Sequence, residues 1–106
     1  MALTKWHATT NPTEIRRFGK LLEECGELVN VAARCIIQGI DEVDPGTERV
    51  NRYRLEDELA DVAAQITATV DILGLNEKRI IARGVTKLDL MHEWEAMYDG
   101  EVHGVH

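Results

Sequence analysis

Apolar residues recur every three or four positions along the first third of the chain. They fall at Ile15, Phe18, Leu22, Cys25, Val29, Ala32 and Ile36. Kept over three heptads, this spacing predicts one long amphipathic helix with a coiled-coil-like seam. Asn11 and Pro12 favour its start and Gly39 its end. A second apolar line, at Leu21, Leu28 and Cys35, predicts that the helix contacts more than one neighbour.

The rest of the chain predicts further helices and no strands. A second helix is expected from near Asn51 or Arg52 to Leu73, stopped by Gly74, after a polar loop over residues 40–51 with a turn at Asp44-Pro45-Gly46. Asn76 favours a third helix, expected to reach about Tyr98 with a bend or break at Gly84 and to be followed by a frayed tail. The sequence has no alternating strand pattern and no internal repeat, so we expect an all-α fold.

Length and charge limit the possible domain organisation of the chain and the kinds of molecule it can bind. The chain has 106 residues, which suits a single domain over 1–106: a bundle of long antiparallel helices completed by homo-oligomerisation as a dimer or a dimer of dimers. A net charge of −7 argues against a nucleic-acid partner or an anionic membrane surface. The sequence has no apolar run long enough for a membrane span and no secretory leader pattern, so we expect a cytoplasmic protein.

Two acidic pairs stand out against this helical pattern. Glu24 and Glu27 fall in the first expected helix, and Glu58 and Asp61 in the second. Each pair is spaced i, i+3, which places both carboxylates on one helix face. Leu28 and Val31 flank the first pair, and the second lies on the shoulder of the apolar stripe, where a carboxylate destabilises the fold unless it is used.

Side-by-side packing of the two helices would gather all four carboxylates around one point. Hard cations with oxygen ligands, Mg²⁺ or Mn²⁺, are the natural compensation for such a group. Glu23 points away from the seam and fits a surface residue, an outer-sphere residue or a base about equally. Lys87 and Arg83 are candidate phosphate contacts, although plain surface cations would have the same pattern.

At these residues the chain resembles the MazG-like, all-α NTP pyrophosphohydrolase superfamily. The signature Glu-Glu-x-x-Glu matches Glu23-Glu24-Cys25-Gly26-Glu27, and Glu-x-x-Asp matches Glu58-Leu59-Ala60-Asp61, within a similar context over residues 15–75. The chain departs from the family in a longer spacer and in its C-terminal third. Lys87 fits the family's lysine there, but Met91 and Trp94 stand where Asn and Arg are expected.

The resemblance implies a fold, a reaction and a set of roles. It implies helical protomers that pair into a bundle and Mg²⁺-dependent hydrolysis of (d)NTP to (d)NMP and pyrophosphate. By position it makes Glu24, Glu27, Glu58 and Asp61 the metal ligands, with Glu23 as an accessory residue and candidate base.

Three other functions compete with this one. A non-catalytic, metal- and nucleotide-binding helical dimer with a regulatory role would share the motif and differ only in turnover. A di-iron carboxylate bundle expects Glu-x-x-His pairs, but Asp61 and Asn30 stand where those histidines would be. A purely structural coiled coil leaves the acids at the seam edge unexplained.

Overall fold

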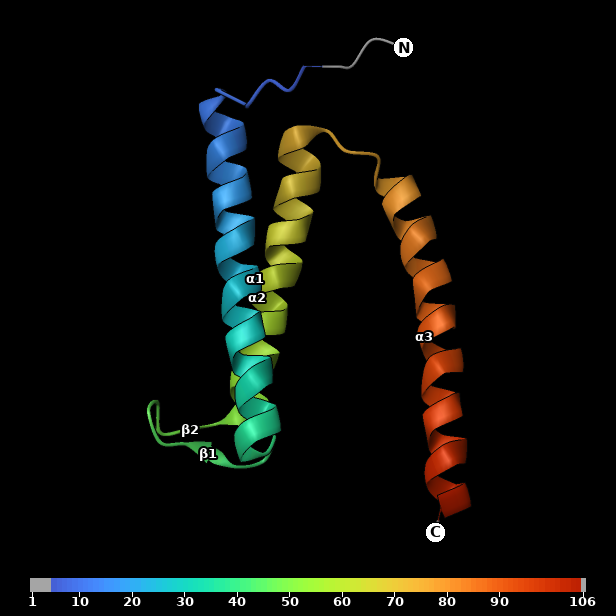
Figure 1. The fold of residues 1–106 in the computed structure, drawn as a ribbon. Helices are drawn as coiled ribbons and strands as arrows, with labels where there is room; N and C mark the ends of the chain where they lie inside the picture. The colour runs from blue at the N-terminus through green and yellow to red at the C-terminus, as the bar shows by residue number, and fades with distance from the viewer. Residues whose placement is uncertain (1–4, 106) are drawn as a thin grey trace. The chain divides into compact units, whose positions relative to one another are not determined.

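The computed structural model describes residues 5–105, with side chains for residues 5–99. It is mostly helical, as the sequence predicts: α1 (Pro12–Gln38), α2 (Asn51–Leu73) and α3 (Glu77–Val105), with the short strands β1 (Val43–Asp44) and β2 (Arg49–Val50) between α1 and α2 (Figure 1). The chain divides into two compact units, Met1–Leu75 and Asn76–His106. A single domain over 1–106 stays a prediction.

Helix α1 begins and ends where the sequence indicates. The Asn11 side chain accepts hydrogen bonds from the backbone N–H groups of Thr13 (2.9 Å) and Glu14 (3.2 Å), which have no carbonyl partner within the helix. Gly39 ends the helix at φ 105°, a conformation that side chains rarely adopt, and its N–H donates to the carbonyl of Cys35. The two ends of α1 therefore define where each of its residues lies along the helix axis.

The connection after α1 was expected to be a polar loop and is instead a small antiparallel ribbon. Strand β1 pairs with β2, Val43 opposite Val50 and Asp44 opposite Arg49. The Asp44 carboxylate accepts hydrogen bonds from the N–H (2.9 Å) and hydroxyl (3.1 Å) of Thr47, and so closes the turn. Strands of two residues are too short for an alternating pattern to show in the sequence.

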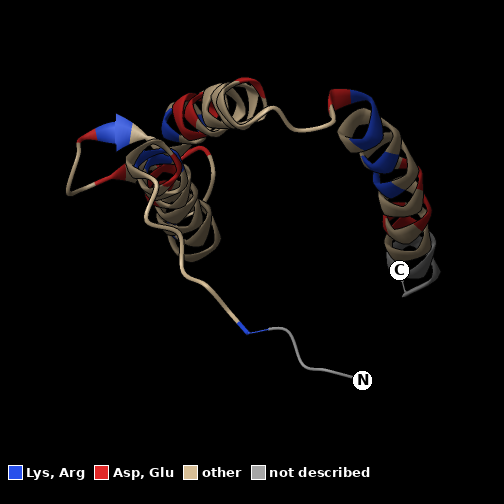
Figure 2. Cartoon of the chain, turned by 90° about the horizontal axis from the view of Figure 1, so that it is seen from above, with Lys and Arg blue, Asp and Glu red and all other residues tan. Residues whose placement is uncertain are grey.

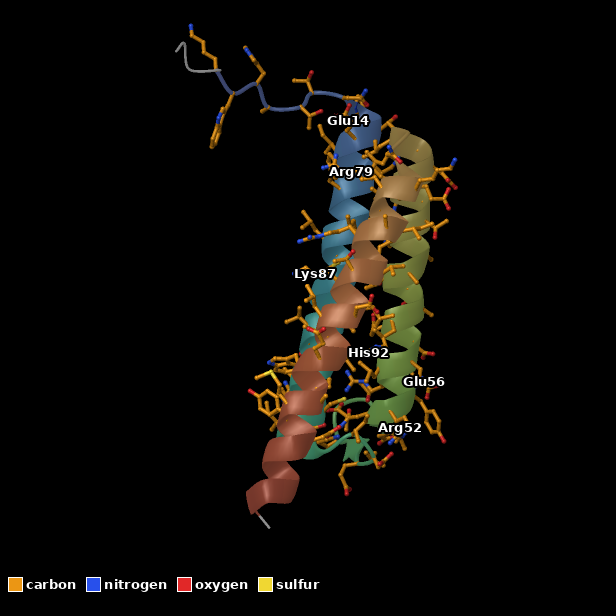
Figure 3. All side chains as sticks on the ribbon, turned by 90° about the vertical axis from the view of Figure 1, so that its right-hand side faces the viewer. Glu14, Arg52, Glu56, Arg79, Lys87 and His92 are labelled. Carbon is orange, nitrogen blue, oxygen red and sulfur yellow. The ribbon has the colours of Figure 1, made fainter. Side chains whose placement is uncertain are left out.

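Helix α2 returns antiparallel to α1. It runs from Asn51 to Leu73, as predicted, and Gly74 ends it in the left-handed conformation at φ 64°. Glu14 near the start of α1 and Arg52 near the start of α2 therefore lie at opposite ends of the helix pair (Figure 3).

A buried polar network joins α1, the ribbon and α2. The side chain of Asn51 is fully buried, and its amide donates to the Gln38 side chain and to the Gly39 carbonyl, each at 3.0 Å. Arg54 donates to the Asn51 side-chain oxygen at 3.1 Å and lies 3.8 Å from the Asp44 carboxylate. Because every member has a partner, the network holds the two helices in one register along their length.

The face of α1 that meets α2 is not the expected main seam. The less exposed positions on α1 lie mainly at 14, 17, 21, 24, 28, 31, 35 and 38, a stripe that includes the secondary line Leu21, Leu28 and Cys35. Large side chains of the expected seam are exposed instead: the exposed fraction is 71% for Leu22 and 87% for Ile36. The contact face thus carries Glu14, Arg17, Glu24 and Gln38 among its apolar residues, and apolar periodicity alone cannot select such a face.

The second unit consists mainly of α3. This helix continues through Gly84 and extends past Tyr98 to Val105, so a break at Gly84 and an end near Tyr98 are wrong. Part of the expected frayed tail, His106, lies outside the described residues. Basic residues gather in the first half of α3 and acidic ones farther along (Figure 2). Within the described residues, no helix is long and apolar enough to cross a membrane.

We expect Asn51→Ala to lower the free energy of unfolding by about 1–3 kcal/mol, because it leaves the Gln38 side-chain oxygen without its donor and removes one hydrogen bond each from Gly39 and Arg54. Asn30→Ala, on the exposed part of α1, is the matched control and should change stability by less than about 0.5 kcal/mol. Urea unfolding at fixed protein concentration measures both. Equal effects of the two substitutions would contradict the structural role of the network.

Candidate metal centre

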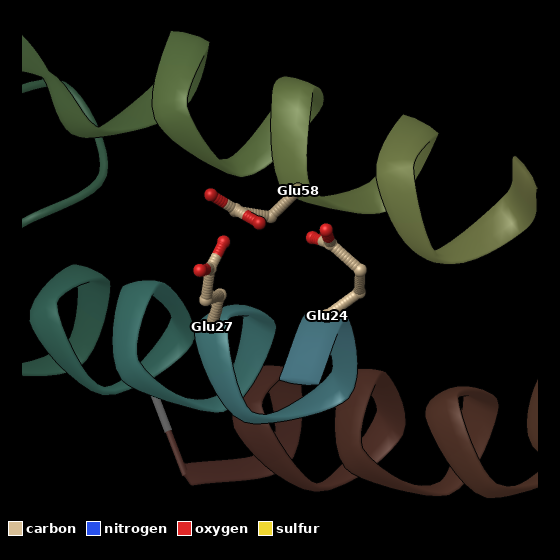
Figure 4. A group of neighbouring side chains, drawn as sticks. All are labelled: Glu24, Glu27 and Glu58. Carbon is tan, nitrogen blue, oxygen red and sulfur yellow. The ribbon is translucent and has the colours of Figure 1, made fainter. Parts of the chain in front are cut away.

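Three of the four predicted carboxylates converge between α1 and α2. Glu24 and Glu27 extend from α1 toward α2, and Glu58 extends from α2 toward them (Figure 4). One carboxylate oxygen from each lies within 4.8 Å of the others. The i, i+3 spacing on α1 and the antiparallel return of α2 produce this convergence.

Burial and mutual repulsion make this group of acids unfavourable without a cation. Burial raises the pKa of Glu24 above its ordinary 4.5, and the charges of Glu27 and Asp61 raise it further, while Lys20 lowers it. Burial and the same two acids raise the pKa of Glu58. One buried oxygen of Glu24 and one of Glu58 have no hydrogen-bond partner within the described part of the chain.

Asp61, the fourth predicted ligand, lies at the edge of this group. It follows Glu58 by three residues on α2, and its side chain is exposed. It does not belong to the group of three oxygens within 4.8 Å. Its charge nevertheless raises the pKa of both Glu24 and Glu58, which places it within electrostatic range of the centre.

Glu23 points to a different environment. Its carboxylate is about half exposed and pairs with the Lys20 ammonium at 3.2 Å. Lys20 also lies 3.8 Å from the Glu24 carboxylate, so it connects the predicted accessory residue with a predicted ligand. Sequence reasoning did not single out Lys20, although its position four residues before Glu24 marks it as a neighbour on the helix surface.

Lys87 and Arg83, the candidate phosphate contacts, belong to α3 in the second unit. Their i, i+4 spacing puts both cations on one face of α3. Both are exposed, and neither forms an ion pair with another described residue. Their part in substrate binding stays a prediction.

The donor set fits a hard divalent cation. All three converging groups are carboxylates, and none is a histidine or cysteine, which zinc and iron centres favour. Two of these carboxylates, Glu24 and Glu58, each have a buried oxygen with no hydrogen-bond partner in the described part of the chain, and a cation would supply one. Glu24, Glu27 and Glu58 would hold Mg²⁺ or Mn²⁺, with Asp61 able to join them.

No protein-family model, curated protein or solved structure matches the chain. The MazG-like resemblance in the acidic motifs therefore stays a prediction. Function has to be inferred from the carboxylate group and its neighbours.

We expect Glu58→Gln to stabilise the metal-free protein at neutral pH, raising Tm by a few degrees. A carboxyl group with a raised pKa binds protons more tightly in the folded chain, so its contribution to stability is greatest at low pH and falls as pH rises above about 4.5. The difference in Tm between Glu58→Gln and the unmodified protein should therefore grow from pH 4.5 to pH 8. Asp41 and Asp44 have pKa values lowered from 3.8, so their contribution to stability has the opposite dependence on pH: it is lost as pH falls below this range.

Glu56→Gln is the matched control, because it removes the same charge from an exposed position of α2. It should leave Tm nearly unchanged. Thermal unfolding in EDTA across this pH range makes the comparison. A Glu58→Gln variant that is less stable than the unmodified protein at pH 8 would contradict the electrostatic account.

Proposed function

We propose that the chain is a Mg²⁺-dependent nucleoside triphosphate pyrophosphohydrolase that converts (d)NTP and water to (d)NMP and pyrophosphate. One observation carries the proposal: Glu24, Glu27 and Glu58 converge from two helices, and one buried oxygen each of Glu24 and Glu58 has no hydrogen-bond partner among the described residues. Carboxylates arranged in this way destabilise the fold unless they hold a cation. The resemblance of the two motifs to the MazG-like superfamily supplies the substrate class.

Each acidic residue has a defined part in this proposal. Glu24, Glu27, Glu58 and Asp61 hold the cation, which when bound supplies positive charge for the phosphate oxygens and lowers the pKa of a nearby water. Glu23, exposed beside Lys20, accepts the proton of the attacking water. Lys87 and Arg83 are proposed to contact phosphate.

The described chain supports attack at the α-phosphorus. The sequence has no Gly-x-x-x-x-Gly-Lys-Ser/Thr loop, whose backbone amides would bind β- and γ-phosphates. A polyphosphate on this site has to be held by a cation on the carboxylates and by separate side-chain cations. The resemblance to the MazG-like superfamily implies, more strongly than these residues alone, one cleavage that releases pyrophosphate rather than stepwise loss of orthophosphate.

We also propose that the protein is a homo-oligomer, a dimer or a dimer of dimers. The exposed line Ile15, Leu22, Val29 and Ile36 repeats every seven residues along α1, as an interhelical seam does. Apolar surface of this length is unusual on a monomer. A second copy covers it most simply, because identical seams are complementary about a two-fold axis.

We expect Glu58→Ala and Asp61→Ala each to lower Mg²⁺-dependent turnover more than about 100-fold. Loss of a residue that only supports a metal ligand typically costs less than this, so a larger loss indicates a direct ligand. The helical circular dichroism spectrum should be retained. Glu56→Ala, which removes an exposed acid of α2 outside the group, is the control and should keep its turnover. A panel of canonical, deoxy and modified NTPs, assayed separately for pyrophosphate and orthophosphate, gives the activities. Unchanged turnover in both variants would contradict the assignment of Glu58 and Asp61 as metal ligands.

Hydrolysis in ¹⁸O-labelled water identifies the bond that is cleaved. Attack at the α-phosphorus places the label in the nucleoside monophosphate. Label in pyrophosphate would instead show attack at the β-phosphorus, and orthophosphate with diphosphate as first products would show a different enzyme class. Binding of metal and nucleotide without turnover would favour the regulatory dimer.

We expect sedimentation equilibrium at micromolar concentration to show a dimer or a tetramer. Leu22→Glu should shift this assembly toward the monomer, because it places a charge in the centre of the exposed seam. Asn30→Glu adds the same charge on another face of α1 and should leave the assembly intact. A stable monomer for the unmodified chain would refute the oligomer.

A further inference from the structure

Arg17 is a cation in the α1–α2 contact without an opposite charge. It lies on the face of α1 that meets α2 and is partly buried. Its Nη2 donates to Oε1 of Gln65 on α2, but its Nε is buried and has no hydrogen-bond acceptor. Among the described residues Arg17 forms no ion pair. A buried Nε–H without an acceptor destabilises the fold.

Arg54, in the polar network beside the ribbon, is arranged differently. Arg54 lies 3.8 Å from the Asp44 carboxylate, with both side chains about 90% buried, and it also donates to the Asn51 side chain. The buried arginine of this network therefore has a carboxylate beside it. Arg17 has only the neutral amide of Gln65, which can orient the guanidinium group but cannot neutralise it.

The position of Arg17 relates it to the metal centre. Arg17 precedes Glu24 by seven residues on α1, and Gln65 follows Glu58 by seven on α2. Because the helices are antiparallel, Arg17 and Gln65 lie on the same side of the carboxylate group, two helical turns or about 10 Å along the helix pair. The contact thus presents a carboxylate group and, farther along, one guanidinium group that is too distant to pair with it.

An anion is the ligand that satisfies this group. The guanidinium fork presents Nε–H beside an Nη–H, a geometry that matches two oxygens of one phosphate. With Nη2 engaged by Gln65, the Nε–H remains free to donate. A cation on the carboxylates would hold one part of a polyphosphate, and a chain that extended from there toward Arg17 would bring its far end to this Nε–H.

We propose that Arg17, oriented by Gln65, binds the terminal phosphate of the nucleotide and so selects triphosphates over shorter phosphates. This inference deepens the proposed function and rests on it for the identity of the nucleotide. It predicts that losing the guanidinium group weakens substrate binding far more than it slows turnover.

Kinetics with three variants tests the part of Arg17 in nucleotide binding. Arg17→Gln should raise KM for NTP about 10- to 100-fold, the effect of losing a charge-assisted hydrogen bond, with a smaller change in kcat. Arg17→Lys keeps the charge but loses the fork and should fall between Arg17→Gln and the unmodified protein. Arg16→Gln, the neighbouring arginine on an exposed face, is the matched control and should change KM less than twofold.

A titration that needs no turnover separates this inference from the proposed reaction. Inorganic triphosphate, added to the unmodified protein with Mg²⁺, should shift the NMR signal of the Arg17 Nε–H and leave that of Arg16 in place. No shift at Arg17, or equal KM values for Arg17→Gln and Arg16→Gln, would overturn the phosphate site. A shift in a protein that hydrolyses no NTP would support the phosphate site while refuting the pyrophosphohydrolase. The titration remains decisive if Arg17→Gln does not fold.

Discussion

The pairing of α1 with α2 is the constraint on which the candidate site depends, because it brings polar layers into a helix–helix contact. At the ribbon end the layer is fully paired through Asn51, Gln38, Asp44 and Arg54. In the middle the layer is acidic and has unpartnered oxygens on Glu24 and Glu58. The paired layer fixes the register, and the register places Glu24 and Glu27 opposite Glu58. Buried polar groups serve specificity in this way at a cost in stability.

This division links stability with the proposed chemistry. Charges that a fold uses only to hold itself together are given partners within the chain, as Asp44 and Arg54 are. The acids of the middle layer repel one another, and burial raises the pKa values of Glu24 and Glu58. A cation would relieve this repulsion, so binding would stabilise the folded chain as well as prepare it for a phosphate substrate. The metal-free protein is then expected to be the less stable form.

The sequence predicted the helices well because their ends have local causes. Asn11, Gly39 and Gly74 act through the backbone of their own turn, and the structure places all three at helix ends. The acids were found for a similar reason, since an i, i+3 pair shares a face in any α-helix. The contact face of α1 could not be read in this way. Its stripe mixes Arg17, Glu24 and Gln38 with apolar residues, and only the antiparallel return of α2 shows that these polar groups face a partner helix.

An anomalous diffraction experiment on crystals grown with Mn²⁺ tests the central claim most directly, because Mn²⁺ takes the same oxygen ligands as Mg²⁺ and can be located by its scattering. The account predicts a peak between α1 and α2 at coordination distance, about 2 Å, from oxygens of Glu24, Glu27 and Glu58. At saturating Mn²⁺, no peak among these carboxylates, or a peak only elsewhere on the chain, would contradict it.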